Sequence, residues 1–222
     1  MSSPKKRYAL ILVLFICHLS VFGQDFLMSF RGGVSAFRGE TSKDASFLIE
    51  ELGQDYSIIG YLPLDNAQWQ ISAELAYSHA MAERDLLGSN NFVVGTYKAT
   101  STHYYLGVGA RYVFNKDARG FSLYSGQFLP YVGLSMGLLN FQNSTNRELV
   151  PASGFKISEE MFWGFTGQLE LGFTIMLNDQ VGLGAFGAGR LGTSDYWDGI
   201  DGLTNFTDWM MRGGVQLSYA FD

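Results

Sequence analysis

The stretch that decides the fold closes the chain: Trp209-Met210-Met211-Arg212-Gly213-Gly214-Val215-Gln216-Leu217-Ser218-Tyr219-Ala220-Phe221. Every second residue from Trp209 to Phe221 is apolar or glycine, and the residues between them are mostly small or polar. Strand side chains alternate between faces, so one face is apolar while the other has too little bulk to fill a hydrophobic core. An apolar face with aromatic residues at both ends suits a surface that meets lipid. The stretch therefore indicates the closing strand of a membrane β-barrel.

Seven further stretches alternate in the same way. They are Phe26–Phe37, Tyr56–Leu62, Trp69–Ala80, His103–Phe114, Leu129–Leu139, Met161–Met176 and Val181–Arg190. Long and shorter connections join them in alternation, as the external loops and periplasmic turns of bacterial outer-membrane barrels do. The long connections are Arg38–Asp55, with a possible helical turn at Phe47–Leu52, then Met81–Thr102, Asn140–Glu160 and Gly192–Asp208.

The alternative is a soluble lipocalin-type barrel, which would carry charged residues on its outer face. Almost none of the eight stretches has a charge among its bulky apolar residues. The sequence therefore predicts an all-β protein: an eight-stranded, antiparallel, up-and-down transmembrane β-barrel over residues 24–222, in the outer membrane.

Residues 1–23 have the layout of a secretory signal peptide. Lys5, Lys6 and Arg7 precede the apolar run Ala9–Leu19, which is too short to span a bilayer comfortably. The only cysteine, Cys17, lies inside that run, so we expect a mature chain without disulfide or lipid anchor. The leader holds three basic and no acidic residues, which leaves twelve basic against 21 acidic residues, a charge of −9. That balance argues against nucleic acid as a partner.

Five charged residues fall mid-strand on the polar parity: Arg31, Glu74, Arg111, Glu170 and Arg212. Arg190 is a sixth candidate in a glycine-rich strand of less certain parity. The interior of an eight-stranded barrel is just filled by side chains, so charges there need partners. We expect a buried ion network that plugs the lumen, because a solute channel would need a wider barrel.

The sequence gives little support to an enzyme. The mature chain has two histidines, His79 and His103, and Ser78, Ser101 and Asp85 lie near them in sequence. No nucleophile is fixed next to a base that a third group orients, as such catalysis requires. We expect no catalytic residue and no cofactor.

The last long connection is acidic and aromatic, with Asp195, Tyr196, Trp197 and Asp198 at its centre. Its carboxylates do not follow the ligand order of an EF-hand loop. We interpret it as a candidate external loop motif whose aromatic residues pack at the rim, and we expect no metal site.

Three segments resemble the PorG family of small outer-membrane barrels in type IX secretion systems. They are Arg190–Asp201, with Thr193, Ser194, Asp195 and Tyr196; Phe30-Arg31-Gly32-Gly33-Val34-Ser35 followed by Gly39-Glu40; and Pro130-Tyr131-Val132-Gly133-Leu134. The chain departs from the resemblance at Gly199, where a second acidic residue would follow Asp198. The resemblance implies a non-enzymatic barrel that docks periplasmic secretion-ring proteins. A stand-alone structural or adhesive barrel with binding loops stays open as an alternative, and an enzyme at the barrel rim is a third.

The end of the closing strand has the form of a recognition signal for the barrel-assembly machinery, carried by Leu217, Tyr219 and Phe221. We expect Phe221→Ala to lower the amount of protein assembled in the outer membrane, because it removes the terminal aromatic residue of the alternation. Asp222→Ala is the matched control and should leave assembly unchanged. Equal surface levels of the two variants, measured by surface labelling of whole cells, would contradict the signal.

Overall fold

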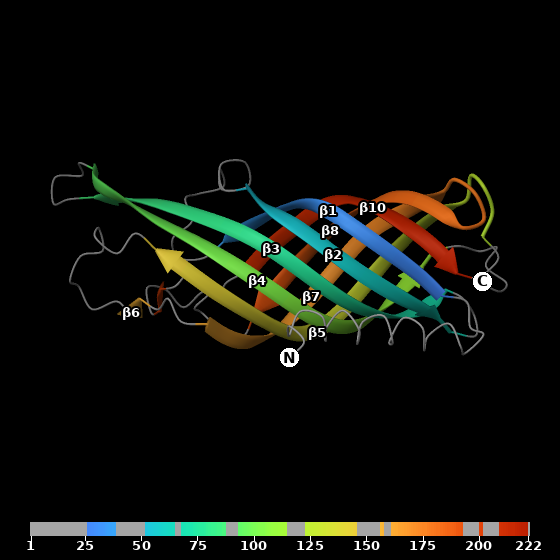
Figure 1. The fold of residues 1–222 in the computed structure, drawn as a ribbon, viewed down its shortest axis with the longest axis horizontal. Helices are drawn as coiled ribbons and strands as arrows, with labels where there is room; N and C mark the ends of the chain where they lie inside the picture. Colours follow the sequence, from blue (N-terminus) through green and yellow to red (C-terminus); the bar gives the residue numbers. More distant parts are fainter. Residues whose placement is uncertain are drawn as a thin grey trace, which may run out of the picture.

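The computed structural model describes residues 26–38, 52–64, 68–87, 93–114, 123–145, 156–157, 161–192, 200–201 and 209–221. Within them, eight strands form one closed barrel, in which every neighbouring pair is antiparallel (Figure 1). The strands, in their order around the wall, are β1 (Phe26–Arg38), β10 (Trp209–Phe221), β8 (Val181–Gly192), β7 (Met161–Met176), β5 (Phe128–Thr145), β4 (Val93–Val113), β3 (Trp69–Leu87) and β2 (Leu52–Pro63). The predicted fold class is confirmed. Among the described residues, no helix is long and apolar enough to cross a membrane.

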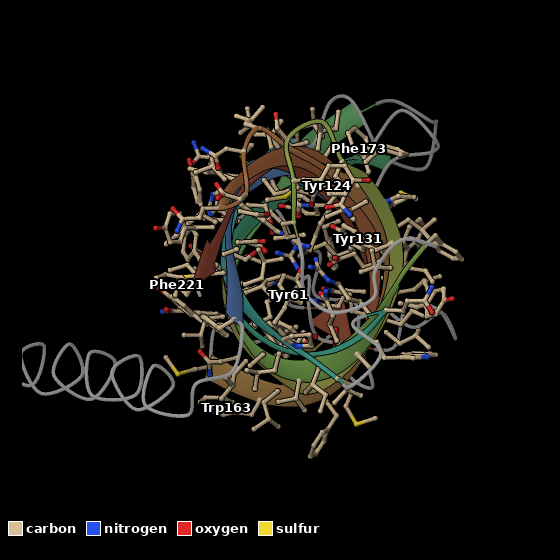
Figure 2. All side chains as sticks on the ribbon, turned by 90° about the vertical axis from the view of Figure 1, so that its right-hand side faces the viewer. Tyr61, Tyr124, Tyr131, Trp163, Phe173 and Phe221 are labelled. Atoms are coloured by element: carbon tan, nitrogen blue, oxygen red, sulfur yellow. The ribbon has the colours of Figure 1, made fainter. Side chains whose placement is uncertain are left out.

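The alternation in the sequence divides the wall into two faces. On β10, Met211, Val215, Leu217, Tyr219 and Phe221 are exposed, whereas Arg212, Gln216 and Ser218 between them are buried in the lumen. Figure 2 looks along the barrel from the right-hand end of Figure 1. It shows Tyr61 and Tyr131 inside the ring of strands and Trp163, Phe173 and Phe221 outside it. The outer surface is thus apolar and the inner one largely polar, the inverse of a soluble barrel.

The ends of several strands differ from the prediction. β7 and β10 have the predicted bounds, but β2 begins at Leu52 instead of Tyr56, and β5 continues from Leu139 to Thr145. Leu52 is therefore in a strand and not in a helical turn, while residues 47–51 lie outside the described part. The stretch Met81–Thr102 is mostly not a loop, since β3 runs to Leu87 and β4 starts at Val93.

The β3–β4 hairpin extends beyond its neighbours. β3 pairs with β2 only as far as His79 but with β4 as far as Leu87, and the hairpin projects at the left in Figure 1. Backbone pairing continues there through a charged stretch of the sequence, Glu83-Arg84-Asp85, which is why the period-two pattern stopped short of the true ends. A separate two-stranded sheet, β6 (Lys156–Ile157) with β9 (Ile200–Asp201), was also missed. It joins two of the predicted long connections.

The seam between the first and last strands needs glycine. Gly33 of β1 lies opposite Gly214 of β10. A Cβ atom on Gly33 would collide with the carbonyl oxygen of Gly213, and one on Gly214 would collide with that of Gly32. The two backbones approach closely at this point of closure, so a side chain has no room between them.

Candidate functional site

The candidate site is the lumen, which is organised in three layers along the barrel axis. A polar layer lies in the middle, and an apolar cluster lies at each end. Among the described residues the buried charged groups are four arginines and three carboxylates: Arg31, Arg111, Arg190, Arg212, Asp55, Glu74 and Glu170. All five residues predicted for the lumen ion network, and Arg190 as well, have their side chains there.

Arg31 and Glu170 form the first centre of the polar layer. The guanidinium donates from Nη1 to Oε2 and from Nη2 to Oε1, both at 2.6 Å, in the two-pronged geometry typical of strong arginine–carboxylate pairs. Nη2 also donates to the hydroxyls of Tyr61 (2.8 Å) and Tyr131 (2.9 Å), and Nε donates to Oε1 of Gln216 (3.1 Å). Arg31 therefore ties together strands β1, β2, β5, β7 and β10 across the lumen.

Arg212 forms the second centre. It donates from Nε and Nη2 to the two oxygens of Asp55, at 2.7 and 2.8 Å. Its Nη1 donates to Oε1 of Glu74 at 2.8 Å and to Oε1 of Gln168 at 2.9 Å. Gln168 completes the group by donating from Nε2 to the second oxygen of Glu74 at 3.0 Å. Ser78 also donates to Asp55, at 2.5 Å.

Asp55 was missed by the sequence analysis, which placed it at the end of a connection. The alternation of β2 contained the signal, because Tyr56 is exposed and the residues on both sides of it, Asp55 and Ser57, face the lumen. The glutamines and tyrosines of the network were missed for another reason. Their role depends on which side chains meet across the barrel.

Arg111 and Arg190 differ from the ion pairs that the sequence analysis expected, since no carboxylate lies within salt-bridge distance of either among the described residues. Arg111 donates to Oε1 of Gln70 at 2.6 Å and stacks 3.3 Å over the ring of Tyr61. Arg190 donates to Gln168 and lies 3.8 Å over the ring of Tyr105. Cation–π contact and amide oxygens replace the carboxylate at both positions.

The apolar layers close the lumen above and below this network. The layer toward the external end contains Phe37, Ala76, Ala80, Tyr105, Leu139, Phe141 and Met210. The layer toward the periplasmic end contains Leu27, Ile59, Tyr61 and Ala220, with Leu123 packed against it. The ends are assigned from the chain's own topology, because both termini of such barrels lie on the periplasmic side.

Leu123 belongs to a segment, Leu123–Gln127, that we call the mouth segment. At one end it is held to the β7–β8 turn: Gly126 N donates to the carbonyl of Met176 (2.7 Å), and Ser125 Oγ donates to that of Leu177 (2.9 Å). At the other end Leu123 packs against an apolar cluster whose residues come from β1, β2 and β10. The mouth segment therefore crosses the periplasmic opening of the barrel, and Tyr124 within it is half exposed (Figure 2).

The two histidines of the mature chain and the serines near them in sequence do not assemble around one accessible point. Ser78 binds Asp55, and His79 Nδ1 lies 3.4 Å from the hydroxyl of Thr102. Ser101 Oγ lies 2.6 Å from His103 Nε2, but both residues are buried and the histidine ring is flanked by Phe37 and Phe141. The imidazole has no exposed surface, so a substrate from solution has no path to this pair in the present conformation. Nothing is described of the side chain of Asp85.

The three residues of the predicted assembly signal are exposed on the outer face of β10. Phe221 contacts Phe26 of the neighbouring β1 and Tyr219 of its own strand, with ring centroids 5.8 and 4.7 Å apart. These rings form part of an aromatic belt at the periplasmic end, with Trp69, Tyr112, Phe114, Phe128 and Phe173. The signal peptide (1–23), Cys17 and the loop motif Asp195, Tyr196, Trp197 and Asp198 lie outside the described residues.

A closed eight-stranded barrel with an apolar outer face, aromatic belts and a polar filled lumen is an outer-membrane β-barrel. Comparison with solved structures agrees with this class. The crystal structure of Neisserial surface protein A superposes with a TM-score of 0.51 at 13% sequence identity, over 86% of this chain and 96% of that one.

Two further barrels are similar at lower scores. The outer membrane protein OprG of Pseudomonas aeruginosa has 16% identity and a TM-score of 0.46, over 89% of this chain and 96% of that one. Ail, the attachment invasion locus protein of Yersinia pestis, has 12% identity and a TM-score of 0.39, over 88% of this chain and 99% of that one. No protein-family model and no curated protein sequence matches the chain.

Removal of one partner of the first ion pair tests the network. We expect Glu170→Leu to lower the free energy of unfolding by about 3–5 kcal/mol, because it leaves the buried charge of Arg31 without its carboxylate. Phe173→Leu, on the same strand but on the outer face, should cost far less. Urea unfolding in detergent micelles, followed by tryptophan fluorescence, measures both. A Glu170→Leu variant as stable as the wild type would contradict the ion pair.

Proposed function

We propose that the protein is a non-enzymatic, non-conducting barrel that anchors a periplasmic component of an envelope secretion machine to the outer membrane. The observation that carries this proposal is the mouth segment. A barrel whose lumen holds a buried network of ion pairs has its ends and its outer wall left for partners, and here the periplasmic end carries a segment held by hydrogen bonds and packing.

The mouth segment supports docking for two physical reasons. It is held in place by backbone hydrogen bonds to the β7–β8 turn and by the packing of Leu123, so a partner would meet a pre-organised surface. It also presents Tyr124 half exposed, next to Ser125, which binds the turn at the carbonyl of Leu177. Tyrosine is one of the residues enriched among the anchors of protein interfaces.

The resemblance of three segments to the PorG family supports a machine of the type IX kind, with secretion-ring proteins as the periplasmic partners. The proposal also includes recognition of the closing strand by the barrel-assembly machinery. The proposed anchoring role needs no cofactor, and it makes no use of the buried Ser101–His103 pair.

A stand-alone adhesive barrel is the second candidate. The protruding β3–β4 hairpin and the β6–β9 sheet support it, because in both of them backbone pairing gives regular structure to chain at the external end of the wall. Such a barrel would bind its partner through that end and would leave the mouth segment without a ligand.

Co-purification separates the two candidates. We expect the tagged wild-type barrel, solubilised from its own outer membrane in mild detergent, to retain a periplasmic protein identified by mass spectrometry. Tyr124→Ser should reduce the retained amount by about tenfold, a loss of about 1.4 kcal/mol of binding free energy. Met161→Ser is the matched control, since Met161 is also exposed but lies at the external end of β7.

Equal retention by the wild type and by both variants would contradict docking at the mouth segment. Loss of the partner only in Met161→Ser would favour binding through the external end.

A further inference from the structure

The outer wall has a groove of about 550 Å³ over the strands β1 to β5, and Trp163 of β7 also lines it. Its lining is almost entirely apolar, and it belongs to the face that the alternation turns toward the membrane. The one charged residue in its lining, Arg31, has its guanidinium in the lumen with Glu170. The groove is therefore a feature of the membrane-facing surface and is separate from the polar network.

Strand register arranges the groove side chains in two rows. The first row is made of residues directly opposite one another on successive strands: Phe30, Ile58, Leu75, Leu106 and Leu138. Each of them is exposed by more than a third of its surface. We call this set the aliphatic row, although it begins with a phenylalanine.

The second row lies one pleat nearer the external end. It consists of Tyr56, Tyr77 and Tyr104, again opposite one another, and we call it the tyrosine row. The ring centroids of Tyr77 and Tyr104 are 5.5 Å apart. Trp163, which lies outside the ring of strands in Figure 2, also lines the groove. None of the three phenol oxygens has a hydrogen bond to another described residue.

The tyrosine row ends differently at its two sides. On β1 the residue opposite Tyr56 is Gly32, and a Cβ atom there would meet only the ring of Tyr56, at 3.9 Å. On β5 the residue between Tyr104 and Trp163 is Asn140, which is buried although its position is on the outward parity. The surface at the level of the row is therefore open on the β1 side, beside Tyr56.

These features together define the occupant. The aliphatic row offers an uncharged trough at the depth of the hydrocarbon, where a chain of methylene groups gains about 0.8 kcal/mol for each one buried. The tyrosine row places hydroxyl donors and acceptors directly above it, at the level where aromatic residues meet the polar headgroups. No cation lies in the outward-facing lining, so recognition of the headgroup has to come from neutral hydrogen bonds.

We propose that this groove is a binding site for one glycolipid of the outer leaflet, with its acyl chains packed across the aliphatic row and its sugar hydroxyl or amide groups hydrogen-bonded by the tyrosine row. Strand register fixes the position of the aliphatic row relative to the tyrosine row, so the two rows together would orient the bound lipid. The site is independent of the anchoring role proposed for the periplasmic end.

Native mass spectrometry with purified lipid A tests the site. Wild-type protein refolded in detergent should retain one lipid A molecule, in preference to phosphatidylethanolamine added at the same concentration. Leu75→Trp, in the middle of the aliphatic row, should reduce that occupancy by about tenfold because its bulk fills the trough. Leu183→Trp is the matched control: Leu183 has the same exposed fraction, 48%, but lies on β8 outside the groove.

Tyr104→Phe separates headgroup recognition from the shape of the groove, since it removes only the hydroxyl. It should remove most of the preference for lipid A over phosphatidylethanolamine while the chain still binds. A boiled-against-unboiled gel shift shows first that each variant is folded. Equal lipid A occupancy in Leu75→Trp and Leu183→Trp would overturn the site, and equal retention of the phospholipid by the wild type would overturn the choice of glycolipid. A dimer in place of a lipid adduct would mean that a second copy covers the groove.

Discussion

Closure of eight strands into a cylinder leaves an interior that side chains just fill, and the rest of this structure follows from that constraint. Inward side chains meet across the barrel, so a charge in the middle layer needs partners from other strands. Arg31 satisfies the constraint by donating to a carboxylate, two phenols and an amide that belong to four other strands. Arg212 does the same with Asp55, Glu74 and Gln168. The network therefore specifies which strands are opposed in the closed barrel, in addition to neutralising charge.

The same constraint explains why the remaining two arginines have no carboxylate. Arg111 and Arg190 each lie over an aromatic ring and donate a hydrogen bond to an amide oxygen. A tyrosine side chain fills more of the lumen than a carboxylate while still offering a negative face to the cation. The apolar layers at the two ends then separate the polar layer from solvent. With the interior closed in this way, the surfaces left for function are the mouth segment, the external hairpin and the groove on the outer wall.

The class of fold could be predicted from the sequence because alternation on β7 and β10 runs without interruption between turns. The same alternation placed Arg31, Glu74, Arg111, Glu170 and Arg212 on the inner face. It failed at the external ends of three strands. β3 and β4 continue as a hairpin through a charged stretch of sequence that does not alternate. The start of β2, with Asp55, had the composition of a polar connection. The partners within the lumen could not be predicted either. Arg31 and Glu170 are 139 residues apart, and the choice of tyrosine over carboxylate beside Arg111 depends on the geometry of the closed wall.

The closed lumen is the central claim, and single-barrel conductance tests it most directly. Purified wild-type protein inserted into a planar lipid bilayer, with insertion verified by the boiled-against-unboiled gel shift of the same sample, should show no large stable conductance. This result is expected because the ion network and the two apolar clusters are buried inside the barrel. A steady, porin-like conductance from the pure protein would contradict the account.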